Sequence, residues 1–313
     1  MADSYSKKSN SKLKQFFAGD LWYDFHHSPV ALLSFSISVL CLLLALTAQL
    51  IAPFDIFDLA AIDLMDADLP PPWAGEEGDS RFFLGTDDQG RDIWSGILYG
   101  AQISIFVGFT SVIISAIIGI ALGLLAGYKG GRIDSFIMRV ADIQLSFPAI
   151  LIALLIDGVM RGLLPREMHD ELAVYVLIFA ISISGWVQYA RTIRGSVMVE
   201  KNKEYVQAGQ VIGLPSHIIA LRHILPNVLN PIFVIGTIHL ASAIITEATL
   251  SYLGVGMSPT TPSLGTLIRI GNEYLLSGEW WITLFPGAAL VILVLSVNIF
   301  GDWLRDALNP KLR

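Results

Sequence analysis

Long apolar stretches alternate with short polar segments along most of the chain. Six of them approach or reach the length of a membrane-spanning helix, since about 20 residues in a helix cross a hydrocarbon core of about 30 Å. They cover residues 30–52, 101–127, 137–156, 172–187, 228–246 and 281–300. The pattern predicts an all-α, polytopic membrane protein with six transmembrane helices, in which 30–52 is the first span and 101–313 holds a core of five helices.

Polar residues and a proline interrupt the third and fourth stretches. The interrupting residues are Gln144, Ser146, Pro148, Ser182, Ser184 and Gly185. Lipid does not tolerate unpaired polar backbone groups, because no water is present to satisfy them. We therefore expect these two helices to lie inside a bundle or beside a cavity.

Small residues recur along the second span and the residues just before it, mostly at every fourth position. They are Gly96, Gly100, Ser104, Gly108, Ser111, Ser115, Gly119, Gly123 and Gly127. This spacing gathers them on one side of a helix, where they let two helix backbones approach closely in a bilayer. The contact is expected within this chain, or shared between this chain and another subunit.

Composition agrees with a membrane protein and excludes several functions. Hydrophobic residues make up 54% of the chain and charged residues 15%, with a mean hydropathy of +0.62, whereas soluble domains are about 25% charged. The net charge of -7 provides no basic surface for nucleic acid. The chain has no G-x-x-x-x-G-K-[ST] loop and no HxxxH pair. We expect neither catalysis nor a metal site in this chain.

Lysine and arginine residues lie mostly on one side of the predicted spans. Fifteen of the 20 fall in the N-terminal tail, around the segments after the second and fourth spans, and in the C-terminal tail. The positive-inside rule then places both termini in the cytoplasm. Residues 53–100 are expected outside, and they carry eleven Asp and Glu residues. This acidic segment is either a docking surface or a solvated face.

The N-terminal tail, residues 1–29, contains apolar residues at roughly helical spacing among polar ones. They are Phe16, Phe17, Leu21, Trp22 and Phe25. The spacing predicts an amphipathic helix that lies at the inner leaflet before the chain enters the membrane.

The cytoplasmic loop at about residues 191–227 has the most specific pattern in the chain. Helix-forming residues lead to Gly213, where a left-handed helix end is expected. Pro215 and Ser216 can start a second short helix, with Ser216 as its N-cap, and Pro226 is expected to limit that helix. In the first of these helices, Ala208 and Gly209 form a small-residue patch that another protein could approach.

This loop resembles the cytoplasmic EAA loop of permease subunits of ABC-type importers. The family pattern is Glu-Ala-Ala, three residues, Gly, and later His/Phe-x-Leu-Pro. The chain has Gln207, Ala208, Gly209 and Gly213, and then the run from His223 to Pro226. Gln replaces Glu and Gly replaces the second Ala, so Gln207 lacks a charge that could pair with a basic residue of an ATPase.

The resemblance continues over roughly residues 80–313. The segment 84–92 and the residues 98–101 are similar to the region before the second span in C-type permeases of dipeptide, oligopeptide and nickel importers. Further similar segments are 127–131, 147–148, 247–254, 262–265, 285–287 and 301–310.

The resemblance implies a type I ABC importer permease in a bacterial inner membrane, carrying short peptides. It implies three kinds of partner: a second, homologous permease that forms a heterodimer with this chain, two cytoplasmic ATPases that bind ATP and Mg, and an extracytoplasmic substrate-binding protein. No cofactor belongs to this chain. The residues implied to couple the chain to the ATPases are Glu204, Gln207, Ala208, Gly209, Gly213, His223 and Pro226.

Ionisable residues within the spans are candidates for a translocation path or gate. Glu247 and His239 lie in the fifth span and Asp142 in the third. A buried charge in a membrane requires a partner, so Glu247 could contact substrate or form an interhelical hydrogen bond, and His239 could be structural. Nickel complexes, glutathione, opines or oligosaccharides are alternative substrates. An ion-coupled secondary carrier is the alternative from another class, and a receptor or structural membrane protein is a third reading.

Overall fold

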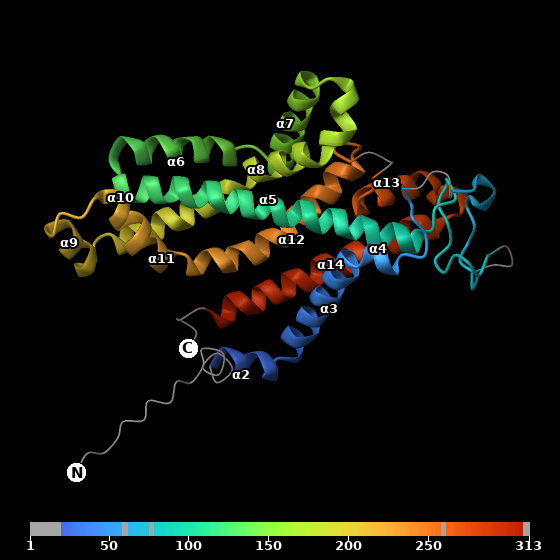
Figure 1. The fold of residues 1–313 in the computed structure, drawn as a ribbon, viewed down its shortest axis with the longest axis horizontal. Coiled ribbons are helices and arrows are strands. Elements are labelled where there is room, and N and C mark those ends of the chain that lie inside the picture. The colour runs from blue at the N-terminus through green and yellow to red at the C-terminus, as the bar shows by residue number, and fades with distance from the viewer. Residues whose placement is uncertain (1–19, 58–61, 75–77, 258–260, 309–313) are drawn as a thin grey trace, which may run out of the picture.

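The computed structural model describes residues 20–57, 62–74, 78–257 and 261–308. Within these ranges the regular elements are helices, and the one isolated bridge joins Thr86 to Asp92. Among the described residues, five helices are long and apolar enough to cross a membrane. They are α3 (Pro29–Leu46), α5 (Ile93–Lys129), α8 (His169–Glu200), α12 (Asn230–Tyr252) and α14 (Trp280–Ala307) (Figure 1).

The expected third span, 137–156, is not one helix. The chain forms α6 (Gly131–Leu145) and α7 (Ala149–Leu163), which are bent by 95° relative to each other. Residues 146–148, here called the elbow, separate them, and Pro148 both lacks an N–H group and disfavours a helical conformation at Phe147. The predicted number of six spans is reached when this bent pair counts as one.

Two of the long helices extend well beyond their apolar stretches. Helix α5 begins at Ile93 rather than at residue 101, because the Asp92 side chain accepts a hydrogen bond from the backbone N–H of Ser95 at 2.8 Å and caps the helix. Its 37 residues span about 55 Å, more than a bilayer core. Helix α8 likewise runs on to Glu200, so the first ten residues of the expected cytoplasmic loop are helical.

The remaining helices are short. They are α2 (Asp20–His27), α4 (Ala48–Ile51), η1 (Leu64–Asp66), η2 (Arg166–Met168), α9 (Glu204–Val211), α10 (Ser216–Ile218), η3 (Ile219–Ile224), α11 (Leu225–Val228), α13 (Leu264–Tyr274) and η4 (Leu275–Ser277). Helix α2 covers Trp22 and Phe25 of the predicted amphipathic tail, whereas Phe16 and Phe17 lie outside the described residues. The Phe25 ring packs against Phe35 and Trp303.

Helices α5 and α8 pack most closely, through the small residues predicted for the second span. A side chain at Gly119 would place its Cβ 2.5 Å from the carbonyl oxygen of Trp186, and one at Gly123 would place its Cβ 2.5 Å from that of Ala190. Ser115 donates a hydrogen bond to the carbonyl oxygen of Ser182 at 3.0 Å. The small-residue stripe therefore makes contacts within the chain.

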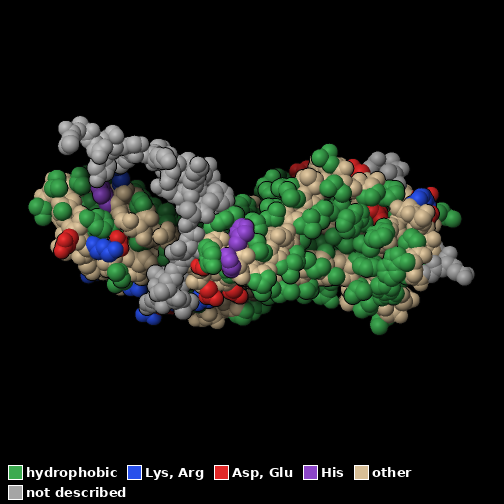
Figure 2. Space-filling view, turned by 90° about the horizontal axis from the view of Figure 1, so that it is seen from below, with side chains coloured by type: hydrophobic (Ala, Val, Ile, Leu, Met, Phe, Trp, Pro, Cys, Tyr) green, Lys and Arg blue, Asp and Glu red, His purple; other side chains and the backbone are tan. Residues whose placement is uncertain are grey.

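The molecule is elongated along α5, and its two ends differ in character. Figure 1 places α9 and α10 at one end, with α2 and the end of α14 towards the same side, and α13 with the 62–92 region at the other end. Figure 2 shows hydrophobic side chains over most of one long face, with Lys and Arg gathered mainly toward one end. A broad apolar face of this kind is the surface expected of a protein that crosses a bilayer.

Candidate coupling loop and translocation path

Helix α9 ends as its sequence predicts. Gly213 has a φ of +83°, a left-handed conformation that a residue without Cβ adopts readily. The backbone N–H of Leu214 donates to the carbonyl oxygen of Gly209 at 3.0 Å, which closes the last turn. The left-handed helix end at Gly213 is thus confirmed, and the chain reverses there into the next helix.

The second helix of the loop differs from the prediction at both ends. Its N-cap is Pro215, with no side-chain capping bond, rather than Ser216. Helical structure continues through Pro226 to Val228, so Pro226 does not end the helix. The π-helical turn from Ile219 to Ile224 precedes α11, and Pro226 lies in the first turn of α11, where a missing N–H group is tolerated.

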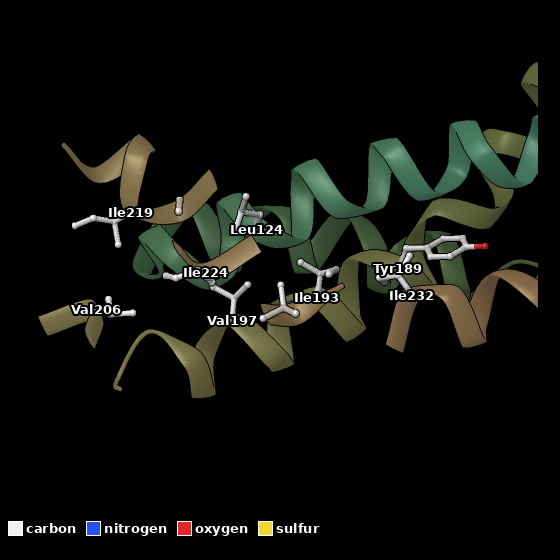
Figure 3. Packing of buried hydrophobic residues seen from close by; sticks show 10 residues of the cluster. Leu124, Tyr189, Ile193, Val197, Val206, Ile219, Ile224 and Ile232 are labelled. Carbon is white, nitrogen blue, oxygen red and sulfur yellow. The ribbon is translucent and has the colours of Figure 1, made fainter. Parts of the chain in front are cut away.

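A hydrophobic cluster holds these short helices against the bundle. Val206 of α9 and Ile224 of η3 are fully buried, and they pack in one cluster with Val197 of α8 and Leu124 of α5 (Figure 3). Gly209 is buried beside Leu214 and Ile219, where an added Cβ would meet their side chains at 3.6–3.7 Å. An alanine would therefore also fit at position 209, so glycine there is compatible with the alanine of the family pattern.

A polar network joins the two halves of the loop to the end of α8. The Tyr205 hydroxyl donates to Oε1 of the buried Glu200 at 2.8 Å, and the Asn227 amide donates to the Tyr205 oxygen at 3.1 Å and to the carbonyl oxygen of His223 at 2.8 Å. Sequence reasoning did not select Glu200, Tyr205 or Asn227 as site residues. Tyr205 and Asn227 are 22 positions apart, so no local spacing could have paired them.

The structure brings the predicted coupling residues together at one end of the molecule. Most of them are exposed, whereas Gly209 is buried and His223 is half-buried, with its Nδ1 at 3.4 Å from the carbonyl oxygen of Ile218. Gln207 donates to the carbonyl oxygen of Asn202 at 3.1 Å. The amide at position 207 therefore has a partner inside its own loop.

Two large apolar side chains project at the tip of this unit. Val211 is 88% exposed and Ile212 is 78% exposed, directly before the turn at Gly213. Burying such side chains is favourable by about 1.5–3 kcal/mol each. Exposed next to a small, well-anchored helix, they provide the apolar part of a surface that a soluble protein could bind.

Glu247 is fully buried in α12, at a junction of helices. Ser251 donates a hydrogen bond to its Oε1 at 2.8 Å, and the side chains of Ser104 on α5 and Ser263 before α13 lie beside it. Of the two roles left open by the sequence, these contacts support an interhelical hydrogen-bonding role for Glu247.

His239 and Asp142 have different surroundings. The His239 Nδ1 is 3.0 Å from the Tyr189 hydroxyl, and its ring lies against Gly185, where an added Cβ would come within 2.3 Å of it. Asp142 is exposed and pairs with Arg191 at 2.5 Å. The contacts of His239 therefore support a structural role for this side chain. Asp142 lies in an ion pair near the C-terminal end of α6, away from the turn at Gly130.

A groove of about 900 Å³ runs between α3, α5, α8, α12 and α14. Its lining is mostly apolar, with Phe35, Phe106, Tyr175 and Phe300 among the larger side chains. Glu247, His239 and Asp142 do not line it. The structure therefore does not gather these three residues along one passage.

The opposite end of the molecule holds a group of carboxylates close to one another. Burial, and then the charge of Asp87, raise the pKa of both Asp68 and Asp88. Burial also raises the pKa of Glu279, together with the charges of Asp68 and Asp88. The Tyr274 hydroxyl donates to Asp88 at 3.3 Å. The acidic segment predicted outside the membrane is therefore partly folded into the structure rather than fully solvated.

The carboxylates of Asp68, Asp88 and Glu279 make the free energy of unfolding depend on pH. Because these pKa values are raised in the folded state, the folded chain binds protons more tightly than the unfolded chain, and stability falls as pH rises from about 4 through the raised values. Replacing Glu279 with Gln should raise the Tm near neutral pH and weaken this decline. Thermal unfolding of the detergent-purified protein between pH 4.5 and 7.5 measures both. The exposed Glu167→Gln provides the control, and an unchanged profile in Glu279→Gln would contradict the assignment.

The fold and its loop define a class of protein: a multi-pass helical membrane protein with a two-helix unit projecting from one end. A family model described as "Binding-protein-dependent transport system inner membrane component" matches residues 119–313. The chain belongs to this family, and it is accordingly a multi-pass component of a bacterial inner membrane.

Two named transport proteins are similar in sequence to this chain over nearly its whole length. The dipeptide transport system permease protein DppC of Haemophilus influenzae is 38% identical over 294 residues, covering 94% of this chain and 95% of that protein. The oligopeptide transport system permease protein OppC of Bacillus subtilis is 36% identical over 312 residues, covering 100% of this chain and 94% of that protein.

A solved structure supports the fold independently. An inward-facing conformation of the MetNI methionine ABC transporter contains a chain that aligns with a TM-score of 0.53 at 20% identity, covering 70% of this chain and 100% of that chain. At this identity the likeness concerns the fold alone. It confirms the expected type I ABC importer permease architecture.

Proposed function

We propose that this chain is a permease subunit of an ATP-driven importer of short peptides. The observation that carries the proposal is the full-length similarity to dipeptide and oligopeptide permeases, and the two short helices α9 and α10 support it. The chain would form the translocation path together with a second, related permease. An extracytoplasmic binding protein would deliver the peptide.

Two cytoplasmic ATPase subunits, with ATP and Mg, would drive the cycle by gripping the unit formed by α9 to α11. The exposed Val211 and Ile212 supply an apolar contact, and the buried Val206 and Ile224 transmit force to α8 and α5. The distribution of Lys and Arg supports a cytoplasmic location for this end and for both termini. The membrane-spanning helices would then have two conformations. Nucleotide binding at one end of the molecule and substrate delivery at the other would shift the equilibrium between them.

The proposal is tested by uptake into proteoliposomes that contain the chain, its partner permease, the ATPases and the binding protein. Radiolabelled dialanine and trialanine are expected to accumulate only when ATP is present inside with the ATPases. Accumulation of neither peptide, with an assembled complex, would contradict the peptide assignment. Accumulation without ATP would instead support an ion-coupled carrier.

Replacing Ile212 with Asp tests the docking surface in the same system. A charge at this exposed position should remove apolar contact worth about 1.5–3 kcal/mol and weaken ATPase binding about tenfold or more, while the chain itself stays folded. Co-purification of the ATPases and ATP-dependent uptake measure the effect. Leu276→Asp is the matched control, because Leu276 is 99% exposed at the opposite end. Full ATPase recovery with Ile212→Asp would place the docking surface elsewhere.

A further inference from the structure

Helix α6 lies along α5 and the C-terminal half of α8, and three polar contacts fasten it to α8. Arg194 forms a two-pronged ion pair with Asp134, in which Nη2 and Oδ2 are 2.7 Å apart. Arg191 binds Asp142 at 2.5 Å. Planar guanidinium groups that bind carboxylates in this way fix both distance and orientation.

The third contact is made by Gln144, two residues before the elbow. Its amide nitrogen donates to the carbonyl oxygen of Ile183 at 2.6 Å and to that of Ser184 at 3.2 Å, and its amide oxygen accepts from the Trp186 indole at 2.8 Å. All three of these hydrogen bonds go to residues 183–186 of α8. The end of α6 next to the elbow is therefore held to α8 by backbone as well as side-chain groups.

Apolar packing supports the same attachment. Ile137 and Ala141 of α6 are buried in a cluster with Trp186, Val187 and Ala190 of α8. The three polar contacts pair residues in antiparallel order along the two helices, from Asp134 with Arg194 to Gln144 with Trp186. Helix α6 is thus fixed to α8 at both of its ends.

This attachment lies between the coupling loop and the elbow. Helix α8 passes through Arg191 and Arg194 and leads within a few residues to α9. The C-terminal end of α6 leads to the elbow and the 95° turn into α7. If a displacement of α9 moves α8, the contacts between α6 and α8 would make α6 and the elbow move together with α8. Without these contacts, α8 could move while α6 stays in place.

We propose that Asp134–Arg194, Asp142–Arg191 and Gln144–Trp186 transmit movement of the coupling loop to the α6–α7 elbow, so that Arg191, Arg194 and Gln144 are positioning residues for transport. The inference rests on the proposed function. It adds that the ATP-driven step requires α6 to move as one body with the C-terminal half of α8. Breaking the attachment should uncouple ATP hydrolysis from uptake without releasing the ATPases.

The test is a charge-reversal cycle in the full transporter reconstituted in proteoliposomes. Arg194→Glu places two carboxylates opposite each other and should lower dialanine uptake per ATP hydrolysed about tenfold, with the ATPases still bound. Asp134→Arg alone should act similarly. The double variant Asp134→Arg/Arg194→Glu restores the pair in reverse and should recover most of the uptake. Arg132→Glu is the control, because it reverses an exposed charge of α6 that takes part in none of the three contacts.

A second pair of variants covers the case in which charge reversal prevents folding. Trp186→Phe removes the indole N–H donor together with part of the buried ring, and Gln144→Ala removes the whole amide contact while leaving Trp186 in place; both should lower the ratio of uptake to hydrolysis. Spin labels at Asn202→Cys and Ser146→Cys, with Cys41→Ser, give an independent readout. Their separation should stay constant when ATP binds in the parent chain and should change in Arg194→Glu.

The outcomes separate the two proposals. If the parent transporter does not import peptide, the proposed function itself fails. If the parent imports peptide and Arg194→Glu, Asp134→Arg and Gln144→Ala do so with the same uptake per ATP, the attachment of α6 has no role in coupling. Failure of the double variant to exceed both single variants would also overturn the inference.

Discussion

Replacing Gly213 with Val is expected to reduce ATP-dependent uptake about tenfold or more while leaving the protein in the membrane. Gly213 has a φ of +83°, and a residue with a Cβ loses about 1–2 kcal/mol in that conformation, or about tenfold in population. No atom lies within 4 Å of the position of an added Cβ, so the effect comes from the backbone and not from a collision. The turn would open and displace the exposed tip of α9. Uptake and ATPase co-purification at equal membrane abundance measure the result.

Two variants show whether the backbone explanation is correct. Gly213→Asn should keep most of the activity, because asparagine tolerates the left-handed conformation. Gly278→Val imposes the same kind of strain at the other end of the molecule, where φ is +105° and the site is also open. It should leave ATPase binding unchanged. Equal activity of the Val and Asn variants at position 213 would show that this turn does not control coupling.

Replacing Gly119 with Leu is expected to prevent correct folding in the membrane. An added Cβ would lie 2.4 Å from Cβ of Tyr189 and 2.5 Å from the carbonyl oxygen of Trp186, so α5 and α8 would have to separate. Overpacking usually costs about 1–3 kcal/mol, and more is expected where the obstacle is backbone. Size-exclusion chromatography and thermal unfolding of the detergent-purified protein should show aggregation, or a large fall in Tm.

Gly236→Leu is the matched control for this prediction. Gly236 lies within α12, and no atom is within 4 Å of an added Cβ, so leucine there changes apolarity and size without a collision. Its elution profile and Tm should match those of the parent protein. A stable, monodisperse Gly119→Leu variant would mean that α5 and α8 are not packed as closely as described.

Most of the spans could be predicted because the bilayer imposes a local rule. A helix must present about 20 apolar residues to lipid, and that requirement is visible in a single stretch of sequence. The ends of α5 and α8 could not be predicted in the same way, since both helices continue through polar residues outside the apolar belt. The N-cap of α5 at Asp92 is a local signal that could have been used.

The third span shows where local reasoning stops. Gln144, Ser146 and Pro148 mark an interruption, but they do not determine its angle. Next to the 95° bend, Gln144 binds carbonyl groups of α8 that are about 40 residues further along the chain, a contact that no local pattern specifies. Similarly, the π-helical turn at Ile219 allows the helix to continue through Pro226, where the proline alone indicated an end.

By itself, the sequence determined the features that depend on neighbouring residues: the apolar spans, the left-handed turn at Gly213 and the small-residue face of α5. The tertiary structure alone decided which groups meet across long separations. It buries Glu247 among three serines, places His239 against Tyr189, and binds α6 to α8 through Arg191 and Arg194. The physical reason is that backbone conformation and lipid exposure act locally, whereas the partner of a buried polar group is set by how whole helices pack.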